Sequence, residues 1–135
     1  MANALYDLGR EGFLGGDIAW DTDNIKVVLL DMTDYTPNLA TDQFLSDVPV
    51  GARVATSSNL TTKTISSGVA DAADVVFSSV TGDECEYVGI YQDTGVEASS
   101  RLIALIDTAT GLPVTPNGGD ITVQWDNGVD KIFKL

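Results

Sequence analysis

The sequence predicts a mainly β fold: an antiparallel β-sandwich or barrel-like domain with a short N-terminal helix. Short β-branched or aromatic runs recur at intervals of roughly 10–15 residues, and clusters of Gly, Asp and Thr separate them. Sixteen of the 20 acidic residues are Asp, which favours turns and caps, and only four are Glu, which favours helix interiors. With 135 residues and no linker-like stretch, we expect one domain, residues 1–135, comprising an N-terminal helical segment (1–16) and a β domain (25–135).

The N-terminal segment is predicted to be helical over residues 2–14. Asn3 can cap this helix, and apolar residues follow at a loose three-to-four spacing: Leu5, Leu8, Phe13 and Leu14. Gly9 and Gly12 each weaken a helix by ~1 kcal/mol relative to Ala, so we expect it to need a packing partner. Residues 15–16, both glycine, end it.

The β domain is predicted to contain strands at 25–30, 52–57, 60–66, 75–77, 86–91 and 102–106. The first is a continuous apolar run after Lys26, as in a central strand covered on both faces. Residues 41–48 predict one or two helical turns, capped by Thr41 and stopped by Pro49. Residues 68–74 predict a turn.

The C-terminal residues predict a β-hairpin around the Asn127-Gly128 pair. A three-residue loop, with Gly128 in the left-handed conformation, pairs Trp125 with Val129 and Ile121 with Phe133. A two-residue loop would mix apolar and charged positions, so the three-residue loop is preferred. It gathers apolar residues on one face: Ile121, Val123, Trp125, Val129, Phe133 and Leu135.

The charge balance excludes several classes of partner. Twenty acidic and seven basic side chains give a net charge of −13 at pH 7. Such a chain repels phosphate backbones and anionic lipid surfaces, so we expect neither nucleic-acid nor membrane binding. Because residues 1–10 show no basic leader or apolar core of a signal peptide, we expect the protein to be made in the cytoplasm of the host cell and to stay soluble.

The residue types available argue against catalysis. The chain has no histidine, which removes Ser-His, Cys-His and His-metal chemistry. Its one cysteine, Cys85, lies among Asp83, Glu84 and Glu86, whose charges should raise the thiol pKa and keep it unreactive. We expect no enzyme activity, no catalytic residue and no cofactor.

Two acidic stretches are interpreted as polar turns. Residues 21–24 (DTDN) resemble the opening of a calcium loop, but Lys26 and Met32 stand where the pattern needs Gly and Glu, so we expect no metal site. The carboxylates around Cys85 could perform acid–base chemistry only inside a cleft, and their Thr-Gly-Asp-Glu context is typical of a solvated loop.

Nearly the whole chain resembles small virion structural proteins of tailed bacteriophages. The strongest likeness is GLPVTPNGGDITVQWDNG at 111–128. The preceding motifs occur in the same order as in that family: MANALY (1–6), GDI (16–18), IKV (25–27), YTPN (35–38), FLSD (44–47) and GVADAAD (68–74). The resemblance implies a virion component, and it carries no catalytic residues to transfer.

Within such a particle, the expected role is that of a capsid decoration (cement) protein in the virion. It would bind the outside of the head shell, bridge copies of the major capsid protein and associate with itself as a trimer. Many weak contacts would act together through avidity. The candidate interface residues are apolar and lie in the N-terminal region: Leu5, Leu8, Phe13 and Trp20.

Two alternatives stay open. A tail, neck or baseplate component would have the same composition but ring symmetry. A carbohydrate-binding module would instead need Trp and Tyr side chains exposed on a sheet face, and the chain has two Trp and four Tyr from which to build one. An apolar surface patch would favour assembly, and an exposed aromatic row would favour sugar binding.

Overall fold

The protein forms an antiparallel, β-sandwich-like fold with one short N-terminal helix, and its sheets do not close into a barrel. The computed structural model describes residues 3–135. The main sheet has the order β1-β8-β7-β2-β3, formed by Ala4–Leu5, Leu102–Ile106, Tyr87–Gln92, Ile25–Leu30 and Arg53–Thr56. The fold class predicted from the sequence is therefore confirmed.

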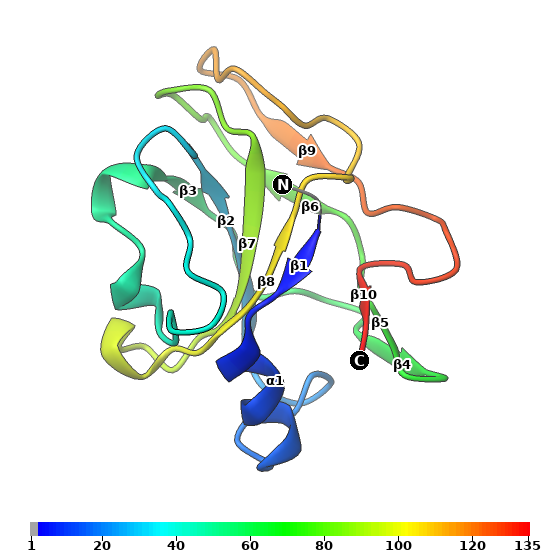
Figure 1. Ribbon diagram of the computed structural model, residues 1–135. Helices are drawn as coiled ribbons and strands as arrows, with labels where there is room; N and C mark the ends of the chain where they lie inside the picture. The colour runs from blue at the N-terminus through cyan, green and yellow to red at the C-terminus, as the bar shows by residue number, and fades with distance from the viewer. Residues whose placement is uncertain (1–2) are drawn as a thin grey trace.

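Two small sheets lie on one side of the main sheet (Figure 1). The first has the order β10-β5-β4, from Phe133–Lys134, Val69–Asp71 and Thr64–Ser66. The second pairs β6 (Val75–Phe77) with β9 (Ile121–Val123). The segment 31–52, which contains only the short 3-10 helices η1 (Leu45–Asp47) and η2 (Val50–Ala52), lies on the other side. A third 3-10 helix, η3, spans Glu97–Ser99.

The inner strands are apolar along their length because both faces of the main sheet are covered. Every residue of β8 is buried, and β2 and β7 each have one partly exposed residue, Lys26 and Gln92. Side chains alternate between faces along a strand, so a doubly covered strand needs apolar residues at successive positions. The central strand predicted at 25–30 is confirmed, as are the strands at 75–77 and 102–106.

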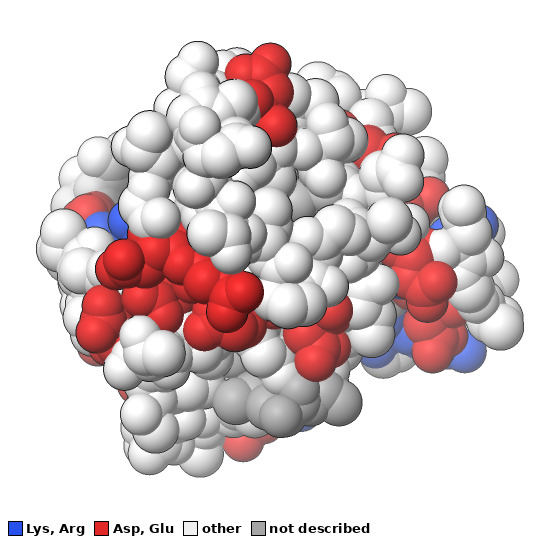
Figure 2. Space-filling model, turned by 90° about the horizontal axis from the view of Figure 1, so that it is seen from above, with Lys and Arg blue, Asp and Glu red and all other residues white. Residues whose placement is uncertain are grey.

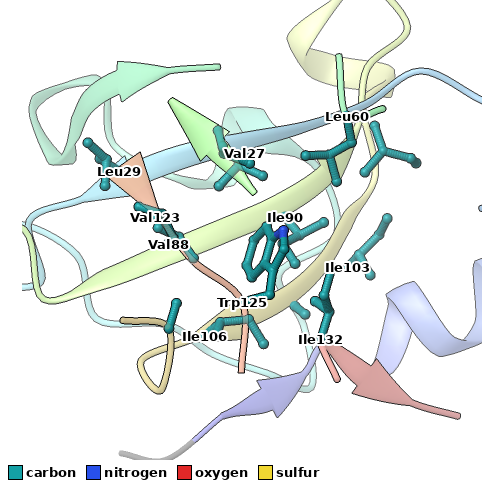
Figure 3. Packing of buried hydrophobic residues seen from close by; sticks show 14 of the residues in the cluster. Val27, Leu29, Leu60, Val88, Ile90, Ile103, Ile106, Val123, Trp125 and Ile132 are labelled. Atoms are coloured by element: carbon teal, nitrogen blue, oxygen red, sulfur yellow. The ribbon is translucent and has the colours of Figure 1, made fainter. Parts of the chain in front are cut away.

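The face toward the small sheets, called here the strand-covered face, carries the larger part of the core. Figure 3 shows Val27, Leu29 and Ile90 of the main sheet pointing toward Val123 and Trp125. The opposite, loop-covered face packs against the segment 31–52 and includes these buried residues: Tyr6, Val28, Leu30, Tyr35, Leu45, Val48, Tyr91 and Leu105.

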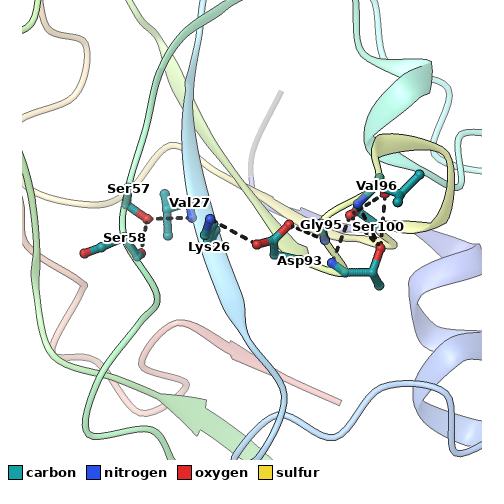
Figure 4. A network of polar contacts seen from close by, with 9 residues as sticks. Lys26, Val27, Ser57, Ser58, Asp93, Gly95, Val96 and Ser100 are labelled. Atoms are coloured by element: carbon teal, nitrogen blue, oxygen red, sulfur yellow. Dashed lines mark hydrogen bonds and ion pairs between the residues drawn. The ribbon is translucent and has the colours of Figure 1, made fainter.

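Polar side chains connect neighbouring strands of the main sheet where the backbone hydrogen bonding between the strands ends (Figure 4). Ser57 Oγ accepts a hydrogen bond from Val27 N (2.9 Å), directly after β3 ends. Lys26 Nζ lies 3.0 Å from Asp93 Oδ2 at the end of β7. The lysine is the main cause of the lowered pKa of the Asp93 carboxyl, so both charges contribute to holding β2 against β7.

The N-terminal prediction needs correction. The α-helix α1 spans Asp7–Leu14 and not 2–14, because Ala4 and Leu5 pair as β1 with β8. Asn3 is not a helix cap, since its Oδ1 accepts from Asp107 N at 2.7 Å. Gly9 packs α1 closely onto β8: a Cβ at this position would lie 2.5 Å from Leu102 O. The glycine that weakens the isolated helix therefore permits its docking.

Two predictions in the middle of the chain are also wrong in detail. Thr41 does not cap a helix; instead the Asp47 carboxylate accepts from Gln43 N (2.8 Å) and Phe44 N (3.0 Å) around η1. The turn expected at 68–74 is the strand β5, paired with a β4 that is shorter than predicted. Ser67 and Gly68, both with positive φ, form the tight turn between them.

The predicted C-terminal hairpin does not form. β9 pairs with β6, so that Val123 faces Val75, and β10 pairs with β5. The long-range β6–β9 pair buries an apolar side chain at both ends of each strand: Val75, Phe77, Ile121 and Val123. Ile121, Val123, Trp125 and Phe133 are buried, as the alternation predicted, but Val129 is 92% exposed and Leu135 is 56% exposed.

Within residues 3–135, the longest helix is α1 with 8 residues, and no helix has the length and hydropathy needed to span a bilayer.

Candidate functional site

The candidate interface residues Leu5, Leu8, Phe13 and Trp20 differ in how far they are buried. Leu5 and Phe13 are half-buried against the core, and Leu8 is half-buried on α1. Trp20 is only 3% exposed. Its ring packs edge-to-face on Phe133 (centroids 5.2 Å apart), and its Nε1 donates to Asp71 O at 3.1 Å. Trp20 is therefore mostly buried within this fold, and its role at an interface stays a prediction that depends on the small part of its ring that lines a surface groove.

An apolar groove lies beside α1 and is named here the α1 groove. It encloses about 210 Å³, enough for one or two side chains of a partner, and is lined mainly by Phe13, Ile18, Trp20, Ile65, Phe133 and Leu135. Ile65 of β4 and Leu135 are more than half exposed. Leu14, which follows Phe13 at the end of α1, is 88% exposed. Exposed apolar side chains beside an apolar groove are typical of protein-binding surfaces.

The groove combines segments that are remote in sequence. α1 supplies Phe13, the β4–β5 hairpin supplies Ile65, and the C-terminal residues supply Phe133 and Leu135. Phe13 and Phe133 lie 6.0 Å apart between ring centroids, so α1 and β10 meet at the base of the groove. Of the residues identified by the sequence, Phe13 and Trp20 belong to it, but Leu5 and Leu8 do not line it.

The second distinct surface is strongly acidic. Five carboxylate residues and Thr33 line an open pocket of about 380 Å³, named here the acidic pocket: Asp31, Asp34, Asp83, Glu84 and Glu86. One carboxylate oxygen from each of Asp31, Asp34 and Asp83 lies within 4.8 Å of the others. Figure 2, which looks at the molecule from above, shows acidic side chains gathered on this side.

The five carboxylates are not equivalent. Asp31 is 4% exposed, and its Oδ1 accepts from Thr33 N (2.9 Å) and Thr33 Oγ1 (2.6 Å), which lowers the pKa of its carboxyl. Burial raises the pKa of the Glu86 carboxyl. Glu86 Oε1 accepts from Met32 N at 3.2 Å, whereas Oε2 is shielded from solvent and accepts no hydrogen bond from residues 3–135. The pocket as a whole repels anions and attracts basic groups.

Only half of this pocket was identified from the sequence. Residues 83–86 were interpreted as a solvated turn, and no sequence pattern connects them with Asp31 and Asp34. The connection comes from the β2–β7 pairing, in which Leu30 faces Tyr87. The residue after β2 and the residue before β7 therefore emerge side by side. By contrast, in the acidic loop at 21–24 a carboxylate oxygen is already used in hydrogen bonds within the fold, because Asp23 Oδ2 accepts from Ala19 N and from Gln92 Nε2.

Cys85 lies next to the acidic pocket but is fully buried. Its backbone pairs with Val114 through two hydrogen bonds of 2.8 and 2.9 Å. Burial, followed by the neighbouring carboxylate of Glu86, raises the thiol pKa to about 12. The predicted direction of this shift is confirmed, and burial contributes more to it than the charges that the sequence indicated.

The aromatic side chains do not form a sugar-binding platform within residues 3–135. Both tryptophans and all four tyrosines are buried, none being more than 7% exposed. Trp125 is a core residue, as its strand register predicted, and its Nε1 donates to Ala73 O at 3.0 Å. A stacking surface for sugar rings needs exposed ring faces, which these six residues do not provide.

No known protein-family profile matches the chain, and no curated protein is significantly similar to it. The α1 groove and the acidic pocket are therefore interpreted from their own chemistry.

Proposed function

We propose that this protein is a non-enzymatic structural component of a tailed-bacteriophage virion, a decoration protein that binds the outer surface of the head. Its partner in this role is the major capsid protein, and its copies associate as trimers at the seams between capsid subunits. The virion context rests on the ordered sequence motifs described above, of which the stretch 111–128 is the longest.

The observation that carries the binding role is the α1 groove with its exposed apolar rim. Ile65 and Leu135, which line the groove, are each more than half exposed. Apolar side chains in such a position gain free energy when a partner covers them, at about 25 cal/mol per Å² of apolar surface buried. One groove of this size gives weak binding, and many copies on one particle make weak contacts effective.

The charge distribution supports an external position on the particle. The net charge is −13, and the acidic pocket concentrates part of it on one side. A decoration protein must assemble on the shell without binding the DNA that is packaged inside or released nearby, and negative charge provides this selectivity.

The experiment that tests the proposal measures binding of the purified protein to mature heads stripped of minor proteins, with isolated tails as the comparison. Saturable binding to heads, at a high copy number per particle, is the expected result. Binding to tails alone would assign the protein to the tail, neck or baseplate. Binding to neither would reject a virion role of the kind proposed.

A pair of matched double variants tests the groove itself. The variant I65T/L135Q changes two groove-lining residues that are 58% and 56% exposed. The control V50Q/V76T changes two residues that are 73% and 54% exposed and do not line the groove. We expect the groove variant to bind heads about tenfold more weakly, as hot-spot truncation does, and the control to bind like the wild type. Equal effects in the two variants would exclude the groove as the contact.

A further inference from the structure

The chain contains two Asn-Gly pairs in exposed loops, Asn117-Gly118 and Asn127-Gly128. An asparagine followed by glycine can lose its side-chain amide without an enzyme. The backbone nitrogen of the glycine attacks the Asn side-chain carbonyl carbon, and the missing Cβ leaves both the approach and the required backbone rotation unhindered. The reaction needs a free backbone N–H and a free side-chain amide, and the two loops differ in both.

The Asn117 loop holds both reacting groups. Gly118 N donates to Val80 O at 2.7 Å, which keeps the attacking nitrogen in a hydrogen bond. Asn117 Oδ1 accepts from Gly119 N at 3.0 Å, which fixes the side-chain amide. Both bonds must break before the nitrogen can reach the side-chain carbon.

The Asn127 loop restrains neither group. Asn127 and Gly128 are exposed, and no hydrogen bond to the Asn127 side chain or to Gly128 N is found within residues 3–135. The hydrogen bonds that hold this loop involve atoms other than the two reacting groups. Trp125 N donates to Asp74 Oδ1 (3.0 Å) before it, and Lys131 N donates to Gly128 O (3.2 Å) at its far side.

We propose that Asn127 is a site of spontaneous deamidation and that Asn117 is protected from it. Gly128 N loses its proton to water and forms a bond to Asn127 Cγ. This bond closes a five-membered ring. The Cγ–Nδ2 bond then breaks, Nδ2 leaves as ammonia after taking up a proton, and a succinimide remains. Water opens the ring at either carbonyl carbon and gives aspartate or isoaspartate. The net reaction consumes one water, releases one ammonia and involves no change of oxidation state.

The product changes the loop electrostatically. A carboxylate replaces a neutral amide between Asp126 and the nearby Asp130, and the net charge changes from −13 to −14 for each converted chain. The reaction needs only water and an unrestrained loop, so this inference does not depend on the proposed function. On a long-lived particle whose proteins are not replaced, the converted fraction rises with the age of the particle.

The test incubates the full-length folded protein at mildly alkaline pH and follows each site by peptide mapping with mass spectrometry. Deamidation adds about one dalton to the affected peptide and produces a separable isoaspartate form. We expect the peptide containing Asn127 to convert about tenfold faster than the one containing Asn117, because the hydrogen bonds at Asn117 must open first.

Two controls complete the experiment. In denaturant, where the hydrogen bonds of Gly118 and Asn117 are lost, the two sites should convert at similar rates. The variant N127Q should abolish the fast conversion without changing that of Asn117. Equal rates in the folded protein, or a faster rate at Asn117, would overturn the proposal.

Discussion

The two faces of the main sheet are covered by different kinds of structure and are held by different interactions. On the strand-covered face, aliphatic residues such as Leu29 and Ile90 pack against Val123 of β9 and against Trp125, which follows that strand (Figure 3). On the loop-covered face, the segment 31–52 contributes no strand, and polar side chains add to a few backbone hydrogen bonds such as the bridge between Phe44 and Arg101.

Side-chain hydrogen bonds hold the segment 31–52 on the loop-covered face. Tyr6 and Tyr35 share a hydrogen bond between their hydroxyls (2.7 Å), and Tyr35 donates to Asp42 Oδ2 at 2.8 Å. Arg53 donates from Nε and Nη2 to Val48 O and from Nη2 to Leu45 O. A segment without strands still carries backbone groups that need partners. The side chain of Arg53 supplies some of them, and backbone bonds such as Leu45 N to Ser100 O (2.8 Å) supply others.

The largest expected effect compares one leucine from each face. Leu29 is 0% exposed on the strand-covered face, and Leu45 is 8% exposed in η1 on the loop-covered face. We expect L29A to lose about 4 kcal/mol of unfolding free energy and L45A about 2 kcal/mol, because the loop can settle into the space and the paired strands cannot. Denaturant titration with an unchanged m-value measures both losses. Equal losses would mean that the two faces are equally rigid.

A smaller effect tests the side-chain hydrogen bonds of the loop-covered face directly. We expect R53K to lose about 2 kcal/mol, because a lysine cannot bond Val48 O and Leu45 O together as the guanidinium does. The control is E97Q, which removes only the ion pair of Arg53 with a 57% exposed carboxylate and should cost below about 0.5 kcal/mol. If E97Q costs as much as R53K, the surface ion pair and not the backbone bonding holds this face.

The smallest effect concerns the acidic pocket, where the covering segment leaves β2 at Asp31. Glu86 has a raised carboxyl pKa, so the folded protein binds its proton more tightly than the unfolded chain does. The contribution of Glu86 to stability therefore falls as pH rises from the ordinary value of 4.5 through the raised one. We expect E86Q to lose this pH dependence and to be more stable at pH 7 by less than about 1 kcal/mol.

The measurement is thermal or chemical unfolding of E86Q and wild type between pH 4 and pH 8, at low and high salt. The gain should shrink at high salt, because repulsion among the pocket carboxylates is screened. E11Q, which changes an exposed carboxylate on α1 outside the pocket, is the matched control and should show no comparable gain. A pH-independent gain would point to packing in place of charge.

Four strands of the main sheet, β2, β3, β7 and β8, were predictable because their signal is local, whereas β1 lies in a segment that was predicted to be helical. The apolar runs at 25–30 and 102–106 have the composition of doubly covered strands, and no knowledge of their partners is needed to identify them. Strand partners were not predictable in the same way. The Asn127-Gly128 pair favours a local hairpin, yet β9 pairs with residues 75–77 and β10 with residues 69–71. Alternation sets which side chains share a face, but not which strand lies beside it.

The two candidate surfaces show the same limit. Phe13 was identified from its helical spacing, but Ile65 and Leu135 join it only through the β4–β5 and β5–β10 pairings. Asp31 joins Glu86 only through the β2–β7 pairing. Each surface is assembled from segments whose contact depends on sheet order, which the sequence pattern leaves open.

Chemical labelling of the buried Cys85 thiol can report how often the folded protein opens. With a pKa raised to about 12 and no solvent exposure, the thiol cannot react with a thiol reagent in the closed state. When closing is faster than labelling, the labelling rate equals the equilibrium population of open molecules multiplied by the intrinsic rate of the free thiol. Because Cys85 pairs with Val114 beside the acidic pocket, this rate tracks how often the pairing of these two segments separates, with no engineered probe in the chain.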